Sequence, residues 1–157
     1  IAKQGNLIAV IDGTTVGKTT SQYLPDKVQG GGRKESATLA HVRVNGVWAV
    51  IVASHLDYRD GAKYNSIRVA QAKAVISATK KFALLRGVTY WRERSSIGLD
   101  ENSVSWVRDY AFKPNKLYPA VKAGIDAIYS RRKARANKVI RTRSDHPIVA
   151  ATYGRNV

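Results

Sequence analysis

The chain has 157 residues, of which 44% are hydrophobic, and 27 Lys and Arg against 11 Asp and Glu give a net charge of +16. This length and composition suit one domain, residues 1–157, while the absence of cysteine excludes disulfides, thiolate catalysis and cysteine-bound zinc. The charge points to a polyanion as partner, with nucleic acid first, and no apolar run is long enough for a membrane-spanning helix.

The first part of the chain is expected to hold one strand and two glycine-containing loops. Residues 7–11 form a short apolar run, which predicts a buried strand. Residues 12–20 resemble a phosphate-binding loop, but Asp12 stands where the first glycine is required, which favours a polar turn. Residues 29–34 predict a flexible loop, and Arg33 within it is expected to contact an anionic substrate.

A hairpin is expected next. Residues 37–44 and 47–53 are rich in β-branched residues and are joined by Asn45-Gly46, the strongest short hairpin signal. The first strand alternates in polarity, whereas the second is almost wholly apolar, which is typical of a strand buried on both faces. His41 has no acidic neighbour and alternates with apolar residues, so we interpret it as structural.

The most regular helical pattern covers residues 65–86 and ends before Gly87. Its apolar face is expected to consist of Ile67, Ala70, Ala74, Ala78, Phe82 and Leu85.

The remaining sequence predicts strands separated by short helices and loops. The expected elements are strands at 88–91, 95–99, 124–129 and 148–153, a helix at 103–112 and a loop at 113–122. A basic turn follows the third of these strands, and its Arg131, Arg132 and Lys133 are expected to contact the substrate.

Polar residues stand at the ends of three expected strands. His55 ends one strand, and Asp145-His146 precede another, where they could orient an imidazole, hold a metal, contact a phosphate or form a solvated turn. Asp100 and Asn102 are two residues apart, so on an extended backbone both side chains would point the same way. A carboxylate and an amide side by side can orient a water molecule and bind a phosphoryl oxygen.

These motifs and their order resemble the endonuclease/exonuclease/phosphatase superfamily, which includes the pancreatic-type deoxyribonucleases. The matching stretches are Ser54-His55-Leu56, Leu99-Asp100-Glu101-Asn102, Ile125-Asp126-Ala127-Ile128 and Ser144-Asp145-His146, with an Arg68…Gln71 helix after the first. The resemblance spans residues 30–153 and implies an α+β fold, an αββα sandwich of the deoxyribonuclease-like type.

The family's first strands, which carry an Asn and a metal-binding Glu, are not found in the sequence, and the chain contains no Met. We therefore expect the C-terminal portion of such a domain, completed by an N-terminal segment or a partner chain.

The resemblance also implies roles for individual residues. His146 would be the general base, Asp145 would hold that imidazole or a metal, and Asp100 would orient the attacking water. Asn102 and His55 would stabilise negative charge on the phosphoryl oxygens, with Mg²⁺ or another divalent cation as cofactor. The residues expected to bind substrate are Arg33, Arg68, Arg131, Arg132 and Lys133.

The leading hypothesis is a metal-dependent phosphodiesterase, a nuclease acting on DNA ahead of RNA. The alternative is a non-catalytic, basic nucleic-acid-binding or virion-type structural protein with the same fold. A lipid or small phosphate ester is a third substrate class, for which fewer positive charges are expected. Nothing in the sequence indicates a compartment.

Overall fold

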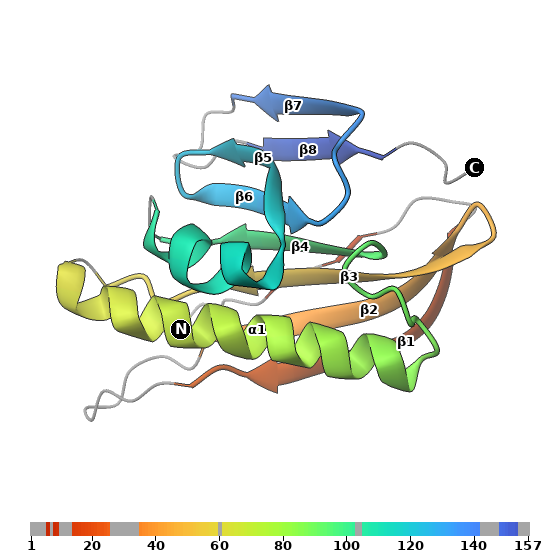
Figure 1. The fold of residues 1–157 in the computed structure, drawn as a ribbon, viewed down its shortest axis with the longest axis horizontal. Coiled ribbons are helices and arrows are strands. Elements are labelled where there is room, and N and C mark those ends of the chain that lie inside the picture. The colour runs from red at the N-terminus through yellow and green to blue at the C-terminus, as the bar shows by residue number, and fades with distance from the viewer. Residues whose placement is uncertain are drawn as a thin grey trace.

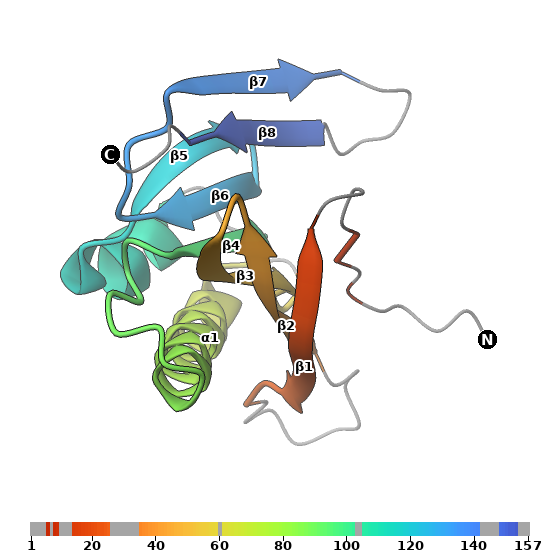
Figure 2. The ribbon, with the colours of Figure 1, turned by 90° about the vertical axis from the view of Figure 1, so that its right-hand side faces the viewer.

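The computed structural model describes residues 6, 8–9, 14–25, 35–59, 61–102, 105–141 and 148–153. A six-stranded mixed sheet in the order β1-β2-β3-β4-β6-β5 forms the centre, and helix α1 lies along one of its faces (Figure 1). Figure 2 shows α1 end-on, on one side of this sheet, with the separate β7–β8 pair beyond β5 and β6. The α+β architecture expected from the sequence is confirmed.

The strands are β1 (Thr15–Tyr23), β2 (Ser36–Val44), β3 (Val47–His55), β4 (Ser95–Asp100), β5 (Tyr118–Ala123), β6 (Asp126–Ser130), β7 (Ala136–Ile140) and β8 (Ile148–Thr152). The helices are α1 (Asn65–Leu85), the single turns η1 (Ala62–Tyr64) and η3 (Lys113–Asn115), and the short π-helix η2 (Arg108–Phe112).

The hairpin of β2 and β3 forms as predicted. Asn45 and Gly46 both have positive φ angles, 51° and 80°, as a type I′ turn requires. This turn sets an antiparallel register that runs from Val44 opposite Val47 to Ala37 opposite Ser54. The prediction that β3 is buried on both faces is wrong, because its burial alternates. One face packs in the core under α1 and the other is half-buried.

The connection from β3 through α1 to β4 brings two strand ends together. β3 and β4 are parallel, and His55 lies opposite Asp100 in their register. Parallel neighbours joined by a helix end at the same edge of a sheet. The last residues of both strands therefore face one another.

The buried face of α1 is rotated relative to the expected stripe. Leu85, expected to be buried, is 69% exposed, whereas Ala72, Val75 and Ile76 are buried. The buried face also contains Arg68, Gln71 and Thr79. Because these residues are polar, the spacing of apolar residues in the sequence does not indicate this face. The core beneath includes Leu39, Val50, Val52, Ile97, Leu99, Phe112 and Tyr129. Across the described ranges, no helix has the length and apolarity to cross a membrane.

β1 occupies most of the stretch for which a polar turn was predicted, so that prediction is wrong. All residues of β1 are exposed, so the strand lacks the alternation of polar and apolar residues that marks a half-buried strand. It pairs with β2 at the edge of the sheet, and the pairing has one irregularity, between Val16 and Thr19. Gly17 lies at this irregularity. A Cβ there would come within 3.1 Å of His41 Nδ1, so glycine permits the close approach.

His41 has the structural role expected of it. Its ring stacks on Trp48 with the centroids 4.1 Å apart, and burial, assisted by the charge of Arg86, lowers its pKa.

Two further sequence-based predictions are wrong. Residues 88–91 form turns rather than a strand, and the Val88 amide donates to Ala83 O at the end of α1. β5 lies where a loop was expected, because Pro119 suggested a break, but a proline is tolerated in an edge strand. Of the strand expected at 7–11, Ile8 and Ala9 lie outside any strand and the other residues lie outside the described ranges.

Candidate functional site

His55 is held between two carboxylates at the end of β3. Its Nε2 atom lies 3.3 Å from Asp100 Oδ2, and its Nδ1 atom lies 3.3 Å from Glu35 Oε2. The side chain is 22% exposed, so the imidazole lies at the surface while the acids beside it are more buried. The expectation that His55 and Asp100 would meet at a strand end agrees with this geometry.

Asn102 completes the group, although by a different route from the one expected. The prediction assumed extended backbone, but β4 ends at Asp100 and Asn102 has a left-handed φ of 46°. The Asn102 amide N–H donates to Asp100 Oδ1 at 3.1 Å, which closes a tight turn. Its side-chain Nδ2 then donates to Leu56 O at 3.0 Å and lies 3.5 Å from His55 Nε2.

Glu35 is a member of this group that was not identified from the sequence. It directly precedes β2, is 7% exposed, and its Oε1 atom has no hydrogen-bond partner among the described residues. Counting outward from the Asn45-Gly46 turn places Ser36 opposite His55, one step beyond the last recorded pair, so the hairpin register was a usable signal. Asn6 reaches the same place, donating from Nδ2 to Ser36 O at 2.6 Å.

The electrostatics of this group keep His55 positively charged near neutral pH. Its contacts with the Asp100 carboxylate and then with Glu35 outweigh the opposing effect of burial and raise the pKa of His55 to about 9. At pH 7 the site therefore holds an imidazolium between two acids. His55 is then suited to electrostatic stabilisation and poorly suited to accept a proton.

The ion pair of Glu101 and Lys122 supports the turn at Asn102. Glu101, between Asp100 and Asn102, is fully buried, contacts Lys122 Nζ, and accepts from Tyr129 Oη at 3.3 Å. Its backbone N–H donates to Ile125 O at 2.9 Å. Burial lowers the pKa of Lys122 against the charge of Asp126. These contacts from β5 and β6 fix the backbone that carries Asp100 and Asn102.

Arg68 is turned into the protein rather than toward solvent. It is 4% exposed, and its guanidinium donates from Nε to Asp57 O at 2.8 Å, from Nη1 to Asn65 Oδ1 at 2.9 Å, and from Nη2 to Arg59 O. Gln71 accepts from the Asp57 amide at 2.8 Å. The two residues expected on the helix after His55 thus hold the loop that follows β3, and this geometry does not support Arg68 as a substrate contact.

Three of the remaining predicted residues lie outside this group, and three lie outside the described residues. Arg131, Arg132 and Lys133 follow β6, whose antiparallel pairing with β4 sets them at the other end of the sheet from Asp100. Arg33, Asp145 and His146 lie outside the described residues, so the predictions for them stay predictions.

Several solved structures share this arrangement of elements. An endonuclease/exonuclease/phosphatase family protein from Bacteroides thetaiotaomicron matches 82% of this chain and 55% of its own length, with 14% identity and a TM-score of 0.66. A truncated TDP2 from Caenorhabditis elegans matches 87% of this chain and 62% of its own length, with 14% identity and a TM-score of 0.60. A mannosyl-6-phosphatase from Bacteroides thetaiotaomicron matches 80% of this chain and 55% of its own length, with 16% identity and a TM-score of 0.57.

No protein-family model and no curated protein matches the sequence significantly. The chain spans little more than half the length of the two Bacteroides structures. At these identities the likeness establishes the fold. The chain therefore has the endonuclease/exonuclease/phosphatase, deoxyribonuclease-like fold that its motifs predicted.

Proposed function

We propose that this chain carries the phosphate-contacting wall of a phosphodiesterase active site and that the enzyme hydrolyses nucleic acid. The observation that carries the proposal is the meeting of His55, Asp100 and Asn102 at the ends of adjacent parallel strands. Ligands of open α/β sheets bind outside the carboxyl ends of the strands.

Asp100 is suited to orient the attacking water. Its Oδ1 atom accepts from the Asn102 amide and its Oδ2 atom lies beside the His55 imidazolium, so the carboxylate has a fixed direction. A fixed carboxylate can accept a hydrogen bond from water and hold that water in line for attack, which lowers the entropic part of the barrier. Paired with a cation, it is better suited to orientation than to proton abstraction.

His55 and Asn102 supply positive charge and a donor for the phosphoryl oxygens. The raised pKa of His55, about 9, keeps it protonated at neutral pH, which favours the extra negative charge of the transition state. An amide nitrogen has two hydrogens, and Asn102 Nδ2 uses one of them for Leu56 O. The second hydrogen is then available to donate to a phosphoryl oxygen beside His55.

The general base is assigned by resemblance to His146, with Asp145 holding that imidazole or a metal. Both residues precede β8, outside the described ranges. Their roles are part of the proposal and rest on the Ser144-Asp145-His146 motif.

The family resemblance also implies Mg²⁺ or another divalent cation. Glu35 Oε1 is a buried carboxylate oxygen with no donor among the described residues, the kind of ligand that Mg²⁺ prefers. Glu35 Oε2 and Asp100 Oδ2 face His55, and Asp100 Oδ1 accepts from the Asn102 amide. The described part of the chain contains no set of three His, Asp or Glu residues that could bind a metal. These residues do not fit a complete metal site by themselves, so no step above depends on a metal.

Nucleic acid is the substrate that the charge favours, with DNA ahead of RNA. A net charge of +16 attracts the phosphate backbone without regard to sequence and makes binding sensitive to salt. Because the chain spans about half the length of proteins that share its fold, we propose that an N-terminal segment or a partner chain completes the domain.

The test is cleavage of plasmid DNA with Mg²⁺ by the wild type, Asp100→Asn and His146→Ala, each assayed together with the N-terminal segment or partner chain that completes the domain. Loss of the water-orienting carboxylate is expected to reduce the rate by about 10²-fold. Asp109→Asn is the matched control, because Asp109 pairs with Arg108 at the surface and has no contact with His55, Asp100 or Asn102 among the described residues. No cleavage by the wild type would sink the proposal for this chain, and equal rates for all variants would sink the assigned roles.

The alternative is a non-catalytic nucleic-acid-binding or virion-type structural protein. It is favoured by the engagement of both His55 nitrogens with carboxylates and by the incomplete metal site in the described ranges. Salt-sensitive DNA binding without cleavage would support it, whereas binding that does not change with salt would remove nucleic acid from both hypotheses.

A further inference from the structure

A basic pocket lies at the end of the sheet away from His55. It has a volume of about 390 Å³ and is formed by the start of β5, the turn after β6 and the start of β7. The residues that give it chemical character are Tyr118, Arg131, Arg132, Lys133 and Asn137.

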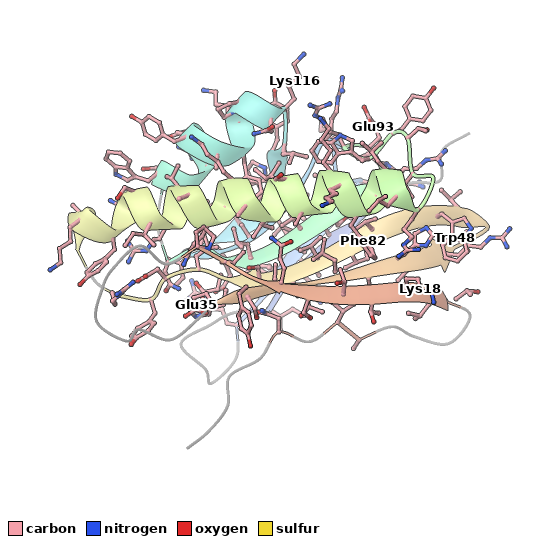
Figure 3. All side chains as sticks on the ribbon, turned by 90° about the horizontal axis from the view of Figure 1, so that it is seen from below. Lys18, Glu35, Trp48, Phe82, Glu93 and Lys116 are labelled. Atoms are coloured by element: carbon pink, nitrogen blue, oxygen red, sulfur yellow. The ribbon has the colours of Figure 1, made fainter. Side chains whose placement is uncertain are left out.

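The register of the sheet separates this pocket from the candidate active site. β6 runs antiparallel to β4, with Asp126 opposite Asp100 and Tyr129 opposite Ile97, so the turn after Ser130 lies near the start of β4. The six residues of β4 span about 16 Å at roughly 3.3 Å per residue. Arg131 pairs with Glu93, and Figure 3 shows Glu93 and Glu35 toward opposite ends of α1. One phosphate cannot contact both places.

Positive charge dominates the pocket. Arg131 Nη1 lies 2.9 Å from Glu93 Oε1. Lys133 is exposed and makes no ion pair within the described ranges, and Arg132 lies with its Cζ atom 5.5 Å from the centre of the Tyr153 ring. Among the described residues, the lining of the pocket contains these three cations and no acidic residue. Such an excess recruits phosphate groups, because each contact releases counterions from a nucleic-acid strand.

Tyr118 gives the pocket an aromatic surface beside these cations. It is 51% exposed at the start of edge strand β5, opposite Ser130 in the register. An exposed aromatic ring next to a positive groove is the combination that binds single-stranded nucleic acid, since every base offers a face for stacking. Asn137, whose Nδ2 donates to Ala120 O at 3.2 Å, ties β7 to β5 and fixes the wall of the pocket.

We propose that this pocket is a second nucleic-acid contact, where Arg132 and Lys133 bind backbone phosphates and Tyr118 stacks on an unpaired base. The choice of nucleic acid as the polyanion rests on the proposed function, but the pocket does not depend on catalysis. A strand stacked as in a duplex advances roughly 3.4 Å per nucleotide, so about 16 Å corresponds to about five stacked nucleotides. Only strands longer than this engage both places.

The test is equilibrium binding of fluorescently labelled single-stranded DNA without divalent metal, for strands of about 3 and about 15 nucleotides. Lys133→Gln and the double change Arg132→Gln with Lys133→Gln are compared with Lys80→Gln with Lys81→Gln, which removes the same charge from exposed positions of α1. The double pocket variant is expected to bind the long strand at least about tenfold more weakly and to reduce the salt slope by about 1.4. The short strand engages one place at a time, so its affinity is expected to fall by a smaller factor than that of the long strand.

Tyr118→Ala is expected to weaken binding of the long strand about fivefold or more, and to have no effect on an abasic strand of equal length. Equal weakening by the pocket and α1 variants, or no dependence on strand length, would overturn the inference. Cleavage assays answer separately. A chain that binds DNA in a length-dependent way but does not cleave it would refute the proposed function and leave the pocket proposal standing. A chain that cleaves DNA but shows no length-dependent binding would refute only the pocket proposal.

Discussion

The charge on His55 predicts a loss of stability at alkaline pH. The imidazolium lies between Asp100 and Glu35, and its pKa of about 9 lies above the ordinary value of 6.5. A group whose pKa is raised by folding stabilises the folded state while it is protonated. The contribution of His55 is therefore complete below pH 6.5 and is lost as the pH rises through about 9.

The size of this loss follows from the same pKa. Each pH unit between the two values is worth about 1.4 kcal/mol, which sets an upper bound of about 3.5 kcal/mol. Because the His55 side chain is 22% exposed, water screens both contacts, and we expect a contribution of about 1 to 2 kcal/mol to the free energy of unfolding.

The assay is urea unfolding of the wild type, His55→Gln and His41→Gln at about pH 6 and about pH 10. The wild type is expected to lose about 1 to 2 kcal/mol more than His55→Gln over this range. His41→Gln is the matched control, because burial lowers the pKa of His41 and this histidine is neutral throughout the alkaline range. Parallel losses in the wild type and His55→Gln would refute the assignment of charge.

Three further changes test the structure around the site. Lys122→Met leaves Glu101 buried without its cation and is expected to lower the free energy of unfolding in urea by about 3 to 5 kcal/mol. Lys73→Met changes an exposed lysine and is expected to have little effect on this free energy. Equal losses in the two variants would contradict the ion pair of Lys122 and Glu101. Asn102→Gly is expected to cost about 1 kcal/mol through its lost side-chain hydrogen bond, and Asn102→Val is expected to cost about 1 to 2 kcal/mol more because of the left-handed φ. The same cost for both would contradict the turn. Leu39→Ala in the core is expected to lower the free energy of unfolding by about 2 to 5 kcal/mol, and a loss below about 1 kcal/mol would show that Leu39 is not packed as described.

The parts of the fold that sequence reasoning found are those with strong local signals. Asn45-Gly46 demands positive φ angles and so fixed the hairpin, and the long helical period fixed α1 to within one residue at its end. The runs at 47–53 and 95–99 were each predicted as strands, whereas their parallel pairing, which brings His55 to Asp100, comes from the structure.

Other features depended on tertiary contacts that leave little trace in local sequence. β1 is an exposed edge strand, so its stability comes from pairing with β2 and its pattern lacks alternation. Arg68 and Gln71 lie on the buried face of α1 because the loop after β3 needs their hydrogen bonds. Glu35 belongs to the site only through the hairpin register, and the turn at Asn102 replaces the extended backbone that its spacing suggested.

Incorporation of oxygen from ¹⁸O-labelled water during DNA cleavage shows whether the site at His55, Asp100 and Asn102 hydrolyses phosphodiesters. With Mg²⁺ present, the wild type is expected to release a terminal phosphate that carries one labelled oxygen, because water attacks phosphorus in a phosphodiester hydrolysis. Asp100→Asn is expected to form this product about 10²-fold more slowly, and Asp109→Asn at the wild-type rate. Intact DNA after incubation with the wild type, or cleavage without label in the phosphate, would contradict a hydrolytic site built on His55, Asp100 and Asn102.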